Sequence, residues 1–268
     1  MDISKLVIRK INRGYGIYRA NGTLNWMLSQ VTDFHIKTEG EKETKNDADG
    51  VPVVDFWKAK KVTITGNTPF FDLDFTAAQW GTKKEVATVS SKILTPYSED
   101  FQTTESQTTY VLEHTPSGVK GAEIKSLMTL SKDGSIATTY KLGTGSATPT
   151  TFLLDAATKK ITLPTGIEAG THFFVFYEYY SSNTVKVTNY AESVPQAEKV
   201  VFEVTGYNIC DTQTAIVFYV VMENGTLSVN SDISTNTTDE NPFEINGSQD
   251  YCVPGKDLVS IIVPGDTE

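Results

Sequence analysis

Short stretches in which apolar and polar residues alternate recur along most of this chain, and each has about the length of a β-strand. The clearest of them lie at 53–66, 173–180, 199–209, 214–222 and 257–264. Val62 and Ile64 show the alternation, and FFVFYEYY (173–180) has the aromatic residues that strands favour. The turn-forming residues CDTQ (210–213) predict that two of these strands form an antiparallel hairpin. The chain is therefore predicted to be mainly β.

One stretch, TPFFDLDFTAAQWGTKKEVA (68–87), predicts a short α-helix instead. Asp72 or Asp74 is suited to cap its first turn, and Gly81 stands where a helix commonly ends in a left-handed residue. Three residues would share one face of this helix at helical spacing: Leu73, Ala77 and Trp80. We expect this helix to pack on a β core.

The middle of the chain predicts a further group of short strands. An Asp-Gly turn at Asp133 and Gly134 predicts a hairpin within 121–143, and two short strands are expected around the lysine-rich turn of 152–166. The region 111–189 is then either an inserted small β module or a set of additional strands of one domain. Residues 1–110 and 190–268 would then form the main β core. Gly, Asn and Asp turn signals recur at short intervals, as in sandwiches and barrels.

A long charged segment, KTEGEKETKNDADG (37–50), separates two of the predicted strands. The methyl group of Ala48 is its only apolar side chain, whereas Val31 and Phe34 lie before it and Phe56 and Trp57 lie after it. Connections between strands usually take about 2–6 residues, and longer loops without a core are usually functional or disordered. The sequence predicts a long loop here that has some function.

The composition, 39% hydrophobic and 21% charged over 268 residues, is that of a globular protein. No run reaches the roughly 20 apolar residues of a membrane span, and the first residues do not resemble a secretory signal. We therefore expect the protein in the cytosol, unless it leaves as part of a larger particle. Cys210 and Cys252 are expected to be reduced and structural, although a bridge between neighbouring strands stays open.

The net charge of −10 is unevenly distributed. Residues 190–268 hold only two of the 23 Lys and Arg residues but thirteen of the 33 Asp and Glu residues. No concentrated basic patch is visible, which argues against tight nucleic-acid binding. Such polarity suits head-to-tail stacking of identical subunits, in which basic and acidic faces meet, although solubility alone would also explain it.

Residue types that carry out catalysis do not gather into any recognisable motif. His35, His114 and His172 are far apart in the sequence, and no nucleophile, phosphate-binding or metal-ligand motif is present. The acidic segment 46–50 is too short for a twelve-residue calcium loop. We predict that the protein is not an enzyme and that it holds no metal or cofactor.

The order of elements resembles that of bacteriophage major tail proteins, also called tail tube proteins. The resemblance is carried by DADGVPVVDFWKAKKVTITGNTPFFDLDFTAAQWGTKKEVAT (47–88), in which a long loop leads into a strand and a short helix that ends in glycine. FLLDAATKKITLPTGIEAGTHFFVFYEYY (152–180) and VVFEVTGYNICD (200–211) are similar to structural proteins of phages of Gram-positive hosts. The similarity covers about two thirds of the chain and contains no invariant motif.

This resemblance implies a mainly β fold, a β-sandwich or half-barrel with one short flanking α-helix. It also implies a virion structural protein of the tail, assembled in the host cytoplasm. Its subunits would form stacked hexameric rings, through which DNA passes without specific binding beside the tape measure protein. The loop would reach the next ring through Lys37, Glu39, Glu41, Lys42, Glu43, Lys45, Asp47 and Asp49. The helix would lie between neighbouring subunits or against the sheet through Ala77, Trp80 and Gly81. An acidic or small polar lumen is expected, because a basic one would trap DNA.

Two other readings stay open. The chain could be a different virion component, such as a capsid decoration or head-joining protein, which would form trimers or monomers. It could also be a cell-surface β module that binds a ligand, for which a saccharide site with exposed aromatic residues would be the sign. The middle region 111–189 is larger than a tube subunit needs, which leaves room for either alternative.

Overall fold

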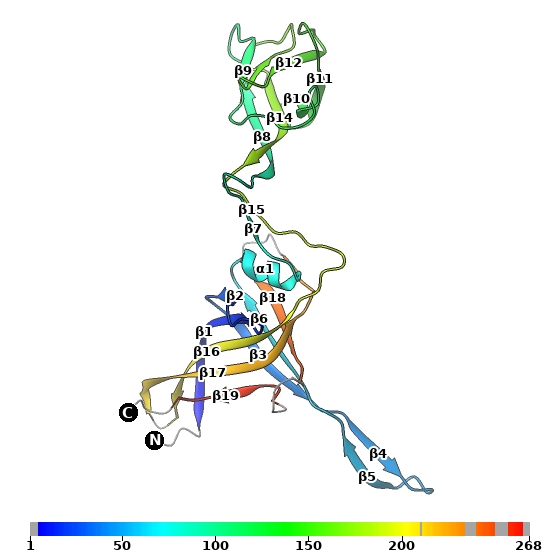
Figure 1. The fold of residues 1–268 in the computed structure, drawn as a ribbon, viewed down its shortest axis with the longest axis vertical. Helices are drawn as coiled ribbons and strands as arrows, with labels where there is room; N and C mark the ends of the chain where they lie inside the picture. Colours follow the sequence, from blue (N-terminus) through cyan, green and yellow to red (C-terminus); the bar gives the residue numbers. More distant parts are fainter. Residues whose placement is uncertain (1–4, 210, 234–239, 250–256, 265–268) are drawn as a thin grey trace. The chain divides into compact units, whose positions relative to one another are not determined.

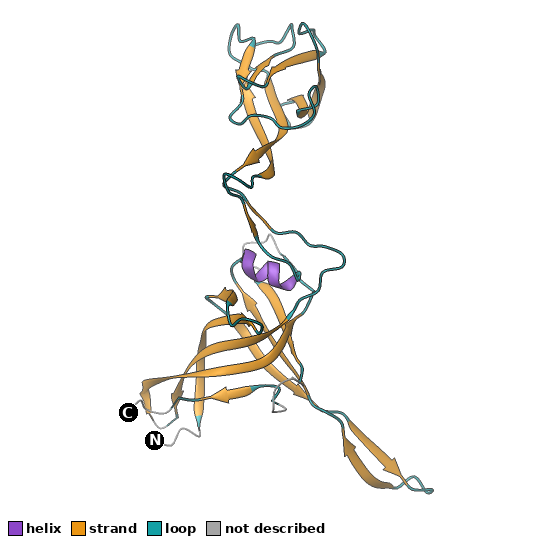
Figure 2. Ribbon diagram, in the orientation of Figure 1, coloured by secondary structure: helices purple, strands orange, loops and turns teal. Residues whose placement is uncertain are grey.

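The computed structural model describes residues 5–209, 211–233, 240–249 and 257–264. The chain divides into two compact units (Figure 1). Unit 1 consists of residues 1–84 and 187–268, and unit 2 consists of residues 85–186. Figure 2 shows that strands make up nearly all of the regular structure of both units, as the sequence predicted. Among the described residues, no helix is long and apolar enough to cross a membrane.

Unit 1 is built on one curled sheet of eight strands. Seven strands follow one another in the order β2-β1-β16-β17-β18-β6-β3, and β19 pairs separately with β17. Their bounds are β1 Leu6–Tyr18, β2 Leu24–Leu28, β3 Thr32–Glu39, β6 Lys61–Thr68, β16 Ala197–Asn208, β17 Asp211–Leu227, β18 Asn241–Gly247 and β19 Ser260–Ile262. All of these neighbours are antiparallel, which gives alternate residues to each face of the sheet.

The curl of this sheet follows from its connectivity. Strands β2 and β3 are consecutive in the chain, yet they occupy the two ends of the strand order. The short link between them carries Val31, which forms an antiparallel bridge to Ile11 of β1. The two ends of the sheet therefore approach each other, and the inward side chains meet in one core. This is the half-barrel that the sequence predicted.

Alternation along each strand fills that core. Val62 and Ile64 of β6 are buried, as predicted, and they pack with inward residues of β16 and β17 such as Phe202 and Phe218. Trp26 of β2 lies only 4.9 Å from the ring of Phe75, at nearly a right angle, which is a favourable aromatic arrangement. These large rings fill the space that the curled sheet encloses.

The predicted helix is α1, Leu73–Gln79. Asp72 caps it, because its carboxylate accepts a hydrogen bond of 2.8 Å from the backbone N–H of Phe75. The predicted buried face was partly wrong, since Leu73 is 36% exposed while Phe75 and Ala78 enter the core. The helix is only seven residues long. Its buried face is therefore set by the large side chain of Phe75, and not by the spacing of Leu73, Ala77 and Trp80.

Unit 2 contains a second curled sheet of seven strands in the order β8-β14-β10-β11-β12-β13-β9. Their bounds are β8 Ile93–Gln102, β9 Thr109–Val111, β10 Ile124–Leu130, β11 Ile136–Leu142, β12 Thr151–Asp155, β13 Lys160–Thr162 and β14 His172–Ser181. The β10–β11 hairpin turns at Asp133 and Gly134 as predicted, and Gly134 has a φ of 82°. The core of unit 2 includes Leu127, Phe152, Ile161, Phe173 and Tyr177.

The sequence left open whether 111–189 is an inserted module or a set of further strands of one domain. In the structure, unit 2 begins at Glu85, because β8 pairs along its whole length with β14. The first and last segments of this unit along the chain, β7 (Glu85–Val86) and β15 (Val185–Lys186), pair with each other in a short ribbon. The pairing of β8 is long-range, which no local pattern in 93–102 could reveal.

The charged segment 37–50 is not a structureless loop, which corrects that expectation. Strand β3 continues to Glu39, and the chain then forms a separate two-stranded ribbon of β4 (Lys42–Asn46) and β5 (Pro52–Trp57). Figure 1 shows this ribbon projecting from the ends of β3 and β6. We call residues 41–58 the arm. The expectation that this segment lacks a core was right, because every residue of β4 and β5 is exposed.

The hairpin of β16 and β17 is confirmed, although its turn is tighter than predicted, because Asn208 already pairs with Asp211. Cys210 and Cys252, whose redox state was predicted, lie outside the described residues.

Candidate assembly surface

Both faces of the arm are uncovered. In the β4–β5 register, Glu43 stands opposite Phe56 and Lys45 stands opposite Val54 on one face. The other face carries Trp57, opposite Lys42. Since neither face packs on a core, the arm consists of a lone hairpin, and a lone hairpin is only marginally stable in water. The arm would gain stability from any surface that covered it.

Four large apolar side chains of β5 are exposed on this hairpin: Val53, Val54, Phe56 and Trp57. Val53 is 64% exposed and Trp57 is 72% exposed, although they are the kind of residue that usually enters a core. Large apolar residues gathered on one exposed element commonly mark a contact surface. The sequence predicted an ordinary strand within 53–66 and gave these residues no functional role. A signal was present in the sequence: the strand that pairs with β5, KETKN of β4, has only polar residues and so could not help to bury them.

Charged residues at the base of the arm are already paired within the chain. Lys37 and Glu39 lie on β3 and form an ion pair of 2.6 Å, and the hydrogen bond to Lys37 lowers the pKa of Glu39. Glu41 pairs with Lys58 at 3.2 Å, and the backbone N–H of Lys58 donates to the carbonyl of Glu41 at 2.8 Å. These exposed pairs are weak individually. Together they fix the point at which the arm begins.

Along the arm, Lys42 contacts Asp55 at 2.6 Å across the two strands. Asp55 also accepts a hydrogen bond from Thr44, and these contacts, that of Lys42 foremost, lower the pKa of its carboxyl. The ammonium of Lys45 lies 5.9 Å from the centre of the Phe56 ring, within reach of a cation–π contact. Charged and apolar groups therefore share each face of the arm.

Two of the predicted contact residues lie in the turn. The carboxylate of Asp47 accepts hydrogen bonds of 2.9 Å from the backbone N–H groups of Asp49 and Val51. Gly50 has a φ of 82°, a conformation that glycine adopts without strain. Asp47 therefore shapes the tip of the arm, and Asp49 is exposed at that tip.

The predicted helix residues have roles within unit 1. Ala77 is buried, and the indole N–H of Trp80 donates to the hydroxyl of Ser231 at 3.2 Å. Gly81 has a φ of 65°, and a Cβ there would lie 2.2 Å from the carbonyl oxygen of Val194. The structure thus places these residues against the sheet and its adjoining segments, which is one of the two positions expected for them.

The outward face of the sheet in unit 1 is charge-paired. Arg13 of β1 contacts Glu203 of β16 at 3.2 Å, and Lys199 contacts Glu223 of the neighbouring β17 at 2.8 Å. Further along the sheet, the outward positions of β6 carry Thr63, Thr65 and Asn67. On β18, the amide of Asn246 donates a hydrogen bond of 2.8 Å to the exposed carboxylate of Glu244. This face thus carries ion pairs, small neutral groups and a further carboxylate.

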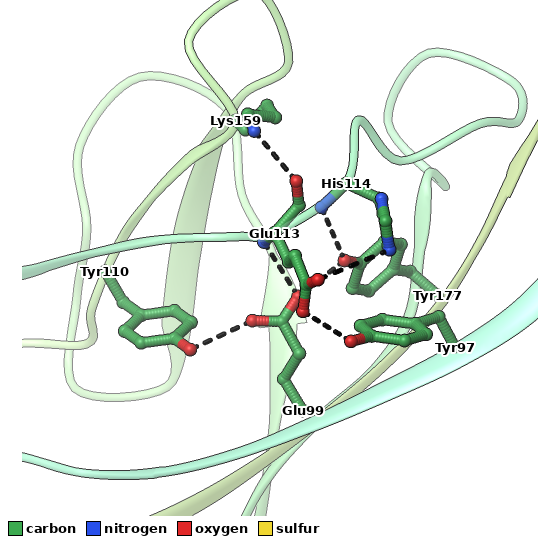
Figure 3. Close-up of polar contacts among 7 residues, drawn as sticks. All are labelled: Tyr97, Glu99, Tyr110, Glu113, His114, Lys159 and Tyr177. Carbon is green, nitrogen blue, oxygen red and sulfur yellow. Dashed lines mark hydrogen bonds and ion pairs between the residues drawn. The ribbon is translucent and has the colours of Figure 1, made fainter.

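A separate cluster of tyrosine and glutamate residues lies in unit 2 (Figure 3). The carboxylate of Glu99 on β8 accepts hydrogen bonds from three donors: the hydroxyl of Tyr177 at 2.5 Å, the hydroxyl of Tyr110 at 2.9 Å and the backbone N–H of Glu113 at 2.9 Å. Because β8 and β9 are the two ends of the strand order, the contact between Glu99 and Tyr110 joins them. This cluster closes the curled sheet with side chains.

The phenols of this cluster remain protonated near neutral pH. Burial and the hydrogen bond to Glu99 raise the pKa of Tyr110 to about 12, and the same causes raise the pKa of Tyr177. The hydrogen bond from Tyr97 to Glu113 raises the pKa of Tyr97 to about 12. Raised values favour hydrogen-bond donation over nucleophilic attack, so these side chains are suited to holding the structure together.

Within the described ranges, no group of three or more His, Cys, Asp or Glu side chains is placed to hold a metal ion. No protein-family model matches this chain, and no curated protein matches it.

Proposed function

We propose that this protein is a major tail protein of a bacteriophage, a virion structural subunit that forms stacked hexameric rings around the path of the DNA. The observation that carries the proposal is the arm, a lone hairpin whose large apolar residues stay exposed and enter no core of the described chain. The half-barrel with the short helix α1 agrees with the resemblance of the sequence to this family.

The energetics of the arm favour contact with another subunit. Burial of one large apolar side chain is worth about 1.5–3 kcal/mol. Phe56 is 50% exposed and Trp57 is 72% exposed. Covering both side chains would therefore offset much of the cost of ordering the arm in a new site. A neighbouring copy supplies such a surface in an assembly of identical subunits, whereas a monomer leaves it in water.

The sheet also supports assembly. Strands β2 and β3 lie at the ends of the strand order and do not pair with each other within the described chain, and unpaired strand edges can pair with another chain. On the outward face, Arg13 and Lys199 are paired with carboxylates, so these two cations are less available to hold phosphate groups. We expected an acidic lumen, and the charge-paired face would serve the same purpose of letting DNA pass. The tape measure protein and other tail proteins are the further partners of this proposal.

Negative-stain electron microscopy of three proteins tests it. In the first variant, an Asn-Gly turn replaces residues 42–57, because Glu41 and Lys58 already face each other across the ribbon. The second variant carries Phe56→Ser and Trp57→Ser and keeps the arm. The control carries Val111→Ser and Ile136→Ser, which make the same kind of change at exposed apolar residues of unit 2.

We expect rings or tubes from the native chain and from the control, with stacking lost in both arm variants while circular dichroism shows an unchanged β content. A native chain that stays monomeric at all concentrations would refute the proposal. A uniform trimer would favour a capsid decoration or head-joining role instead. Tubes that persist without the arm would leave the tail assignment intact but remove the arm from the contact between rings.

A further inference from the structure

Unit 2 contains a groove of about 780 Å³ beside the end of β14. One wall is formed by residues 113–117, and the other by residues 179–184 at and after the end of the strand. Lys92 and Lys159 complete the lining. Ligand sites commonly have volumes of about 300–1,000 Å³. The groove is therefore large enough for a ligand of several rings.

One wall of the groove is held rigidly from behind by the cluster of Figure 3. The backbone N–H of Glu113 donates to Glu99, and the backbone N–H of His114 donates to the hydroxyl of Tyr177 at 3.1 Å. The carbonyl of Glu113 accepts a hydrogen bond of 2.8 Å from Lys159. Three side chains thus form hydrogen bonds with the backbone of Glu113 and His114, which belong to no strand. A wall fixed in advance binds a ligand without paying the cost of becoming ordered.

Aromatic rings line the same groove. The imidazole of His114 stacks on the ring of Tyr179, with centres 3.9 Å apart and planes 3° from parallel. The next residue, Tyr180, has no ring contact among the described residues and is 58% exposed. An exposed tyrosine offers a flat apolar face together with a hydroxyl group. Such a face suits a ligand that is itself flat and apolar on one side and polar at its edges.

Apart from Pro116, the remaining lining is polar. It contains hydroxyl and amide side chains, two lysines and one glutamate. Lys92, Ser182 and Asn183 are all exposed, so the donors and acceptors of their side chains face solvent. An apolar ligand would find little to cover it here. A ligand that carries many hydroxyl groups would find donors and acceptors on both walls.

We propose that this groove binds an oligosaccharide, with a sugar ring stacked on Tyr180 and its hydroxyl groups bonded to Asn183 and Lys92. A phosphate-bearing ligand fits less well, because the carboxylate of Glu113 lies in the same wall as Lys159, whose ammonium already donates to a carbonyl. The proposal goes beyond the role in tail assembly and is independent of it, since the groove lies entirely in unit 2.

Binding of the full chain to an array of neutral and acidic oligosaccharides tests the proposal, followed by titration of the best ligand. Tyr180→Ala and Asn183→Ala are the test variants. Tyr190→Ala is the matched control, because Tyr190 is similarly exposed at 52% and lies outside the groove and outside unit 2. We expect roughly a tenfold loss of affinity for Tyr180→Ala and no change for Tyr190→Ala.

Three outcomes would overturn the proposal: an array on which no oligosaccharide binds, binding that survives both test variants, or binding of ADP or inorganic phosphate that displaces the sugar. None of them bears on the assembly of rings, which is measured separately by microscopy. Loss of binding in Tyr180→Ala without loss of β content would confirm that the groove is the site.

Discussion

The hydroxyl of Tyr177 is the central link of the cluster in unit 2, and its removal by Tyr177→Phe is the sharpest test of how that unit is held closed. The side chain is fully buried. Its hydroxyl donates to Glu99 and accepts from the backbone N–H of His114, so the substitution removes two hydrogen bonds and leaves the ring in place. The packing of the core should not change.

The expected loss follows from what remains unpaired. A hydrogen bond to a charged group is worth about 1.5–3 kcal/mol, and a buried donor left without a partner costs about 1–3 kcal/mol. Because His114 is only half-buried, water can satisfy part of that second cost. We therefore expect Tyr177→Phe to lower the free energy of unfolding of unit 2 by about 2–4 kcal/mol. Tyr110→Phe removes a single hydrogen bond to Glu99 at a more exposed site, so it should cost about half as much.

Hydrogen exchange measured by mass spectrometry is the suitable assay, because it reports the opening of each unit separately. Protection should fall in peptides of β8 and β14. The three tryptophans, Trp26, Trp57 and Trp80, all lie in unit 1. The urea midpoint followed by their fluorescence should therefore be the same in Tyr177→Phe as in the native protein. Equal protection in Tyr177→Phe and the native protein would refute the view that this cluster closes the sheet.

Three further substitutions probe unit 1, each followed by tryptophan fluorescence in urea. Gly81→Ala should lower the free energy of unfolding by more than about 2 kcal/mol, because the added Cβ would meet the backbone of Val194 in a left-handed conformation; an unchanged midpoint would contradict this. Asp72→Ala should cost about 1 kcal/mol through loss of the helix cap to Phe75, and a loss below the error of measurement would show that packing alone holds the helix. Burial raises the pKa of Glu198, so the charged form is disfavoured in the folded state and the stability contribution of this residue is lost as pH rises through that raised pKa. The stability of Glu198→Gln relative to the native protein should therefore increase from pH 4 to pH 7, whereas a difference independent of pH would refute the assignment.

Local elements were largely predictable, because they depend on residues close together in the chain. The cap at Asp72 and the glycine at 81 define the helix, and alternation at Val62 and Ile64 defines their strand. The turn at Gly134 requires a conformation that glycine readily adopts. Each of these signals acts over a few residues, so it survives whatever the rest of the chain does.

The role of a strand was not predictable in the same way. Phe56 and Trp57 belong to a predicted strand, yet they lie exposed on a hairpin that no described segment covers. Conversely, the polar stretch from Lys42 to Asn46 read as a loop, although it is a strand because β5 pairs with it. Backbone pairing and burial depend on which distant segment lies alongside, and composition alone does not specify that.

The sequence by itself therefore determined where most strands and the helix form, and it determined the β class of the protein. Only the tertiary structure decided that β8 belongs to unit 2, that β2 and β3 end the same curled sheet, and that Glu99 joins the two ends of the other. These contacts connect elements at opposite ends of a strand order. They exist because a curled sheet brings its ends together around a core, and that closure is a property of the whole fold.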